Sequence, residues 1–249
     1  TGYGAVYYLE NVLKDHGESI EGKTIAASGF GNVCWGICKK AMQLGAKVES
    51  VIEPDRRNTF PAIALASSYL AMEKGCPEDE VVVVIPSDTY TEPKYYETVA
   101  QMVRLVEQGV AEIVLMGVAP TSPSSKFGYV VPSQPSEDGY HMVHRFVEKP
   151  EAEAAKEYIA QGAYWNAGVF AFRLGDIMKV VNQYVQTDSF DKLRSRYSEL
   201  PRISFDYEVA EVCPSMAVVP YEGLWKDLGD WNALVEELPT ATMGNVILG

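Results

Sequence analysis

The chain lacks any excess of positive charge. Lysine and arginine number 21 against 34 aspartates and glutamates, so the formal net charge is −13 over 249 residues. We therefore expect no nucleic-acid partner, because no basic stretch could neutralise a run of phosphates. Small anionic ligands remain compatible with this charge, since backbone N–H groups hold phosphates and carboxylates bind nucleotides through a divalent cation.

Metal-binding cysteine patterns and long apolar runs are also scarce. The four cysteines are scattered and show no zinc-site pairing with the three histidines. No apolar run approaches the roughly 20 residues that span a bilayer, and no basic-then-apolar leader precedes the first helical pattern. These absences predict a cytoplasmic protein without a membrane partner. The first residue is Thr1 rather than Met, which fits a fragment.

The first 50 residues predict a helix followed by a β-α-β unit. Apolar residues recur at helical spacing over residues 3–15, and a strand then leads into a turn at Gly29 and Gly31. Such a turn lets the backbone approach a pyrophosphate at a helix N-terminus. Cys34 occupies the position where the dinucleotide-binding pattern has its third glycine or an alanine. A tight turn without a ligand is therefore an equally good interpretation.

From residue 51 onward the pattern predicts a larger layered sheet. The run VVVVIPSDT is typical of a strand buried on both faces of a parallel sheet, and a helix over about residues 93–108 leads to a second apolar strand, EIVLMGV. Later strands follow one another without helices between some of them, which predicts antiparallel additions. The predicted fold class is α/β, with a Rossmann-like layered mixed sheet.

Polar residues beside strands are the first site candidates. Asp88 follows a predicted strand, where open α/β sheets bind ligands, although it could instead cap the next helix. Asp227 lies in GLWKDLGDW, which could form a rigid turn or a site wall. Two such carboxylates could hold one divalent cation against a nucleotide's phosphates. Glu148, Lys149 and Asn166 could contact sugar hydroxyls or a phosphate, although each is also a common surface residue.

The opening segment, TGYGAVYYLENVLKDHGESIEGKTIAASGFGNVCWGICKKAMQLGAKV, resembles the start of the coenzyme domain of hexameric glutamate dehydrogenases. In that family the GFGNV turn carries the dinucleotide pyrophosphate, and the threonine of TGYG lies near the nicotinamide. The resemblance implies an NAD(P) site at Thr1, Gly29, Gly31, Asn32 and Val33. The family's catalytic lysine and aspartate belong to a preceding domain that this sequence does not contain. We therefore do not expect oxidoreductase activity.

Six later motifs resemble, in order and spacing, mannose-1-phosphate guanylyltransferases of the sugar-nucleotidyltransferase superfamily. They are EPDRRNTFPAIALA, VVVVIPSDT, PTSPSSKFGYVVP, RFVEKPEAEAAKEYIAQGAYWNAGVFAFR, ISFDYEVAE and VVPYEGLWKDLGDWNAL. The resemblance implies that GTP and mannose 1-phosphate react with Mg²⁺ to give GDP-mannose and pyrophosphate. It assigns the base loop to Glu53, Pro54, Arg57, Asn58 and Thr59, sugar contacts to Gly128, Glu148 and Asn166, and catalytic roles to Lys149 at the sugar phosphate and to the metal-binding Asp88 and Asp227. It leaves open the role of Asp206, in the DY motif.

The chain also departs from that family. The family's glycine-rich GGxGTRLxPLS loop, which wraps the triphosphate and supplies an arginine, has no match, and the dehydrogenase-like unit stands in its place. We predict a segment 1–50 of dehydrogenase type, occupying the missing edge of the sheet, and a nucleotidyltransferase domain 51–249 without the first loop and the C-terminal extension. Impaired catalysis is the expected result. The alternatives are an NAD-binding module with the remainder as scaffold, and a chimera that binds neither ligand.

Overall fold

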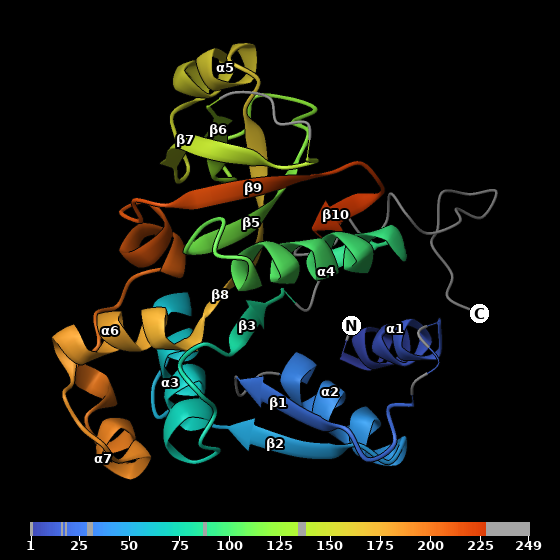
Figure 1. Cartoon of the computed structure of the whole chain (residues 1–249), viewed down its shortest axis with the longest axis vertical. Coiled ribbons are helices and arrows are strands. Elements are labelled where there is room, and N and C mark those ends of the chain that lie inside the picture. The colour runs from blue at the N-terminus through green and yellow to red at the C-terminus, as the bar shows by residue number, and fades with distance from the viewer. Residues whose placement is uncertain are drawn as a thin grey trace, which may run out of the picture.

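The computed structural model describes residues 2–15, 17, 19–28, 32–86, 89–133 and 138–227. The N-terminal unit consists of α1 (Gly2–Asp15), β1 (Thr24–Ser28), α2 (Asn32–Gln43) and β2 (Lys47–Val51). β1 and β2 pair in parallel, and α1 packs against α2 (Figure 1). Val6, Ile20, Ala41 and Ala46 form a small hydrophobic cluster within this unit. The predicted helix and β-α-β unit are therefore confirmed.

A six-stranded mixed sheet forms the centre of the rest of the chain. Its strands are β3 (Val81–Val84), β5 (Ile113–Val118), β6 (Tyr129–Pro132), β7 (His141–Val147), β8 (Tyr164–Arg173) and β9 (Met216–Tyr221). Their order is β3-β8-β5-β9-β7-β6. β5 and β9 pair in parallel, whereas β8 runs antiparallel to both β3 and β5. The predicted mixed α/β sheet is confirmed.

The position of β3 differs from the sequence prediction. The VVVV run pairs antiparallel with β8, and its residues are half-buried at the edge of the described sheet. Because β3 and β5 are both antiparallel to β8, they point in the same direction, and the helix between them crosses over one strand. β8, which comes much later in the chain, fills that gap. Sequence periodicity could not show this insertion, since it carries no information about pairing partners.

The N-terminal unit does not extend this sheet. Among the described strands, β1 and β2 form a separate two-stranded sheet, and β3 hydrogen-bonds only to β8. The prediction that the unit occupies the missing edge is therefore wrong. Its strands instead contact α3 (Thr59–Met72), as Figure 1 shows near the lower edge of the molecule.

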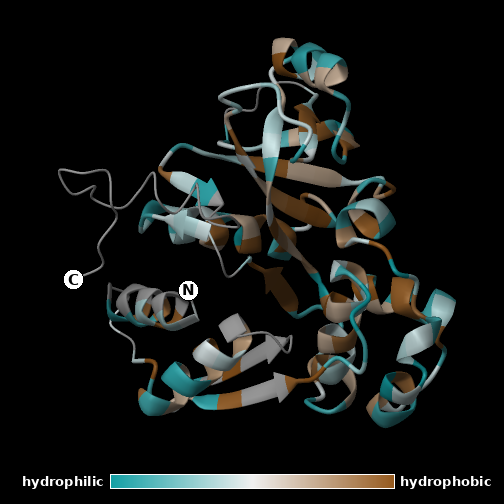
Figure 2. Cartoon of the chain, turned by 180° about the vertical axis from the view of Figure 1, so that it is seen from behind, coloured by the Kyte–Doolittle hydropathy of each residue, from teal (hydrophilic) through white to brown (hydrophobic). Residues whose placement is uncertain are grey.

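Helices cover both faces of the main sheet. They are α3 together with α4 (Lys94–Glu107), α5 (Ala152–Ala160), α6 (Leu174–Tyr184) and α7 (Phe190–Ser195). Along β5, Ile113 and Leu115 pack with the α3, α6 and α7 side, while Val114 and Met116 pack with α4. Figure 2 shows hydrophobic residues concentrated in these central strands. Burial of both faces explains why β5 reads as an unbroken apolar run. None of the helices in the described ranges has the length and hydropathy for a membrane span.

Four short elements complete the described fold. β4 (Thr89–Thr91) and β10 (Trp225–Asp227) pair antiparallel, with Asp227 opposite Thr89. A 3-10 turn (Tyr197–Glu199) and a π-helix, η2 (Asp206–Ala210), connect α7 to β9. The sequence allowed a rigid turn around Asp227, and the structure places this residue at the end of a strand.

Candidate functional site

A cavity of about 230 Å³ opens near the end of β3, among loops from well-separated parts of the chain. Five of the predicted site residues line it: Gly128, Glu148, Lys149, Asn166 and Asp206. Other lining residues are Pro86, Thr89, Lys126, Phe127, Ala167, Gly168 and Trp225. Strand ends of an α/β sheet are where ligands usually bind. The folded chain therefore brings these five predicted site residues together where an α/β sheet usually binds its ligand.

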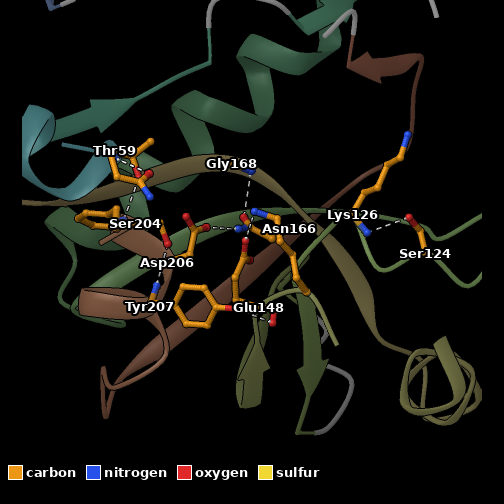
Figure 3. A network of polar contacts seen from close by, with 12 residues as sticks. Thr59, Ser124, Lys126, Glu148, Asn166, Gly168, Ser204, Asp206 and Tyr207 are labelled. Atoms are coloured by element: carbon orange, nitrogen blue, oxygen red, sulfur yellow. Dashed lines mark hydrogen bonds and ion pairs between the residues drawn. The ribbon is translucent and has the colours of Figure 1, made fainter. Parts of the chain in front are cut away.

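Asn166, on β8, is held by three hydrogen bonds. Its backbone N–H donates to the Gly128 carbonyl at 2.8 Å, and its side-chain Nδ2 donates to Asp206 Oδ1 at 2.7 Å (Figure 3). Its Oδ1 accepts from the backbone N–H of Gly168 at 3.0 Å. Gly168 has a φ of 72°, which a residue without a side chain adopts readily. These contacts fix the plane of the amide at the cavity wall.

Glu148 is a buried carboxylate facing the same cavity. Its side chain is only 6% exposed, and Oε1 lies 3.0 Å from Lys149 Nζ. Burial raises the pKa of Glu148, the charge of Asp206 raises it further, and Lys149 opposes both effects. A Cβ at Gly128 would lie 2.5 Å from Glu148 Oε2, so any larger residue there would force this carboxylate to shift.

Lys149 places a positive charge at the cavity opening. Its side chain is 54% exposed, and the hydrogen bond that it donates to Glu148 raises its pKa, which keeps it a cation. Its φ is 47°, a left-handed conformation that costs energy for any residue except glycine. Pro150 follows it and disfavours the right-handed helical alternative. The arrangement fits a lysine that meets a phosphate as a point charge.

Asp206 begins the π-helix and supports Asn166. Burial raises its pKa, and the hydrogen bond from Asn166 lowers it in part. The next residue, Tyr207, donates from its hydroxyl to the Glu148 carbonyl at 3.3 Å. Single-turn π-helices occur often at functional sites. Asp206 and Tyr207 thus contact two of the polar residues that line the cavity.

An aromatic group forms another wall of the cavity. The Phe127 ring lies 4.7 Å from Trp165 and 5.7 Å from Trp225, measured between centroids. Within the described part of the chain, the buried Nε1 of Trp225 has no hydrogen-bond partner. Sequence reasoning did not assign Phe127, Trp225, Gly168 or Tyr207 to the site. The signal for Trp225 was its place in the aromatic and acidic GLWKDLGDW motif.

The two predicted metal ligands are only partly described. Asp88 and the side chain of Asp227 lie outside the described residues, but Asp227 is paired with Thr89, the residue that follows Asp88 in sequence. This register brings the two chain segments together, and carboxylates suit Mg²⁺. Within the described ranges, no group of three or more His, Cys, Asp or Glu side chains could hold a metal ion.

The predicted base loop lies apart from the cavity. Glu53, Pro54, Arg57, Asn58 and Thr59 are not among the described residues that line it. Asn58 precedes α3, and its Oδ1 accepts from the N–H of Thr59 at 2.8 Å. Arg57 also forms an ion pair with Asp55 inside the loop at 3.5 Å, and further contacts run to residues 197–205. The structure therefore shows the loop bonded to a neighbouring segment.

The predicted dinucleotide turn is mostly outside the described residues. This applies to Thr1, Gly29 and Gly31, and to the side chains of Asn32 and Val33. The backbone of Asn32 begins α2, directly after the turn in sequence. The helix start is therefore where a pyrophosphate site would need it.

The fold is that of a nucleotidyltransferase domain. The sequence model of the Nucleotidyl transferase family matches residues 36–243, and the chain belongs to this family. A second model, of the Glutamate/Leucine/Phenylalanine/Valine dehydrogenase family, matches residues 1–55. Both resemblances predicted from the motifs are therefore confirmed. The two matches overlap over residues 36–55, which includes the predicted join near residues 49–51.

The relatives carry more specific names. The chain is 30% identical to a putative mannose-1-phosphate guanylyltransferase of Vibrio cholerae, over 86% of this chain and 49% of that protein. It is 32% identical to a mannose-1-phosphate guanylyltransferase of Escherichia coli, over 86% and 49% respectively. The chain thus spans about half the length of these curated relatives.

Solved structures share the fold. A mannose-1-phosphate geranyltransferase from Thermus thermophilus superposes with a TM-score of 0.70 at 29% identity, covering 85% of this chain and 63% of that one. A UDP-glucose pyrophosphorylase bound to UDP-glucose reaches a TM-score of 0.56 at 16% identity, covering 93% and 84%. At that identity the second likeness supports the fold alone.

Proposed function

We propose that the chain binds a sugar 1-phosphate and GTP and belongs to a mannose-1-phosphate guanylyltransferase. The observation that supports this most directly is the cavity, where four separate segments bring together Gly128, Glu148, Lys149, Asn166 and Asp206. These are the positions that the guanylyltransferase motifs assign to the sugar side or, for Asp206, leave without a role. The names of the relatives supply the choice of mannose and guanine.

In the proposed reaction an oxygen of the sugar phosphate attacks the α-phosphorus of GTP. A new P–O bond forms, the bond from the α-phosphorus to its bridging oxygen breaks, and pyrophosphate leaves with that electron pair. Glu148 and Asn166 orient the sugar hydroxyls, and Lys149 neutralises the sugar phosphate. Asp88 and Asp227 would hold Mg²⁺, which when bound supplies charge neutralisation at the phosphates. Alignment of two anions is the main catalytic task.

We further propose that catalysis by residues 1–249 is slow. The dehydrogenase-like residues 1–50 stand where the family has its triphosphate loop, and their glycine turn contains no arginine. Without that cation, several kcal/mol of charge stabilisation are missing, because removal of a single oxyanion-hole donor costs other enzymes about that much.

The cytoplasmic location predicted from the cysteines stays a proposal. All four cysteines are free thiols.

GDP-mannose with Mg²⁺ is expected to raise the melting temperature of the chain by several degrees, since a ligand at about 100 times its Kd adds roughly 2.7 kcal/mol. Asp227→Ala is expected to remove the Mg²⁺-dependent part of this increase, because one metal carboxylate is lost. Asp79→Ala, at an exposed position before β3, is the matched control. An unchanged Mg²⁺ dependence in the Asp227 variant would exclude this residue from the metal site.

Dinucleotide binding is the second candidate function, favoured by the dehydrogenase-family match and by the parallel β1-α2-β2 unit. We expect NADH to leave the melting temperature unchanged, because Cys34 replaces the third glycine and the described unit has a sheet of two strands only. The same thermal titration with NADH in place of GDP-mannose tests this. A shift with NADH and none with GDP-mannose would reverse the order of the two proposals.

A further inference from the structure

The loop before α3 is bonded to the segment that precedes the π-helix. Arg57 donates from Nε and Nη2 to the Leu200 carbonyl at 3.1 and 2.9 Å. Glu53 accepts from the Tyr197 hydroxyl at 2.8 Å. The Arg57 side chain is only 13% exposed, and its Nη1 also lies 3.5 Å from Asp55 Oδ2. The loop that the motifs assign to the nucleotide base therefore has a second structural role.

The first turn of α3 continues this contact. The N–H of Phe60 donates to the Ile203 carbonyl at 3.3 Å, and the N–H of Phe205 donates to Thr59 Oγ1 at 2.9 Å. The first N–H groups of a helix have no partner inside the helix, so a neighbouring carbonyl satisfies one of them. The Thr59 hydroxyl in turn satisfies an N–H of a residue that is 1% exposed. Thr59 and Phe60 thus fix the backbone of residues 203–205.

That backbone leads directly into the cavity residues, as Figure 3 shows. The Phe205 ring is packed 4.9 Å from Phe170 and 5.4 Å from Phe172, between centroids. The ring packing and the N–H hydrogen bond together fix Phe205. The next residue, Asp206, then accepts through Oδ1 from Asn166 Nδ2 at 2.7 Å. Tyr207 then reaches the Glu148 carbonyl.

We propose that Thr59 is a positioning residue for the sugar side of the site. It acts through Phe205 on Asp206 and so on Asn166, and the loop assigned to the nucleotide therefore also sets the affinity for the sugar phosphate. This inference rests on the proposed function and adds a link between its two half-sites. Thr59 itself does not line the sugar-side cavity.

The test compares Thr59→Val with Thr59→Ser. Valine keeps the shape but removes the acceptor, whereas serine keeps it. We expect Thr59→Val to speed amide hydrogen exchange of residues 203–208 in the ligand-free chain, because the Phe205 N–H loses its partner, and Thr59→Ser to leave it near wild type. Calorimetry should show mannose 1-phosphate binding weakened about three- to tenfold by valine, the range of one hydrogen bond, and restored to near wild type in Thr59→Ser.

The outcomes separate the two proposals. Unchanged exchange at residues 203–208 in Thr59→Val, or an unchanged affinity of that variant for mannose 1-phosphate, would overturn the positioning role. If the wild-type chain binds no mannose 1-phosphate, the proposed function fails and the affinity part of this inference fails with it. The exchange comparison would still decide whether Thr59 holds the π-helix, since it needs no ligand.

Discussion

Replacing Gly128 with alanine is expected to weaken GDP-mannose binding by at least about a hundredfold and to destabilise the fold by about 1–3 kcal/mol, the usual cost of overpacking. The added Cβ would lie 2.5 Å from Glu148 Oε2 and 3.3 Å from both Asn166 Cβ and Phe146 Cζ. The carboxylate would have to move, because 2.5 Å is too short for a Cβ contact, whereas the two 3.3 Å contacts need only a small adjustment. Loss of two oriented polar contacts at about 1.4 kcal/mol each corresponds to the hundredfold change.

A double-mutant comparison isolates this cause. In a Glu148→Ala background the closest clash is absent, so Gly128→Ala should cost clearly less stability there than in the wild type. Urea unfolding of the four proteins measures the difference, and calorimetry with GDP-mannose measures the affinity of wild type and Gly128→Ala. Equal costs in both backgrounds would show that the backbone at residue 128, and not Glu148, needs glycine.

The sequence predicted elements well where burial follows a simple period. The run IVLMGV became β5 because its alternate residues pack on opposite helical layers, and α4 follows an amphipathic pattern. Pairing was not predictable in the same way. β8 lies between β3 and β5 although about 80 residues separate it from β3 in sequence, and nothing local to either strand specifies that contact. The separate β1-β2 sheet was missed for the same reason.

For the site, too, the sequence indicated the residues but not their partners. The motifs named Gly128, Glu148 and Asn166 without indicating what holds them, whereas the folded chain shows the Gly128 carbonyl accepting from Asn166 and the Glu148 carboxylate occupying the space left by the glycine. Arg57 carries a charge that suggests a ligand contact, yet it pairs with the neighbouring Asp55 and donates to a backbone carbonyl 143 positions away. Every residue has a backbone carbonyl, so the sequence gives no sign of which one a side chain will meet.

Glu148→Gln is expected to stabilise the fold at neutral pH while destroying ligand affinity. Burial and the nearby Asp206 raise the pKa of Glu148, so the folded chain holds this carboxylate charged at a cost. A neutral amide of the same shape removes the cost of burying the charge and should raise the free energy of unfolding at pH 7.5 by about 1 kcal/mol, the lower end of the desolvation cost of a buried polar group. Loss of the ion pair with Lys149 cancels little of this gain in stability, because that lysine is 54% exposed and exposed ion pairs contribute little.

The sign of the pH dependence follows from the raised pKa. Between the unfolded pKa and the higher folded pKa, the folded state binds more protons at Glu148, so wild-type stability from this group falls as pH rises through that window. The advantage of Glu148→Gln should therefore be full at pH 7.5 and shrink towards pH 4, where the glutamate is largely neutral in both states. Urea unfolding at the two pH values measures it. Glu157→Gln, the same change at an exposed position on α5, should alter neither stability nor binding.

Opposite signs for stability and affinity would mark Glu148 as a residue kept for its ligand. A buried charge that only supported the fold would be stabilising, and its removal would lower the unfolding free energy at pH 7.5. That result would mean that the pair with Lys149 outweighs burial and that the cavity is a structural feature. The expected result, a more stable chain that no longer binds GDP-mannose, would instead show that the chain holds a carboxylate and a left-handed lysine at a cost to stability, as functional sites do.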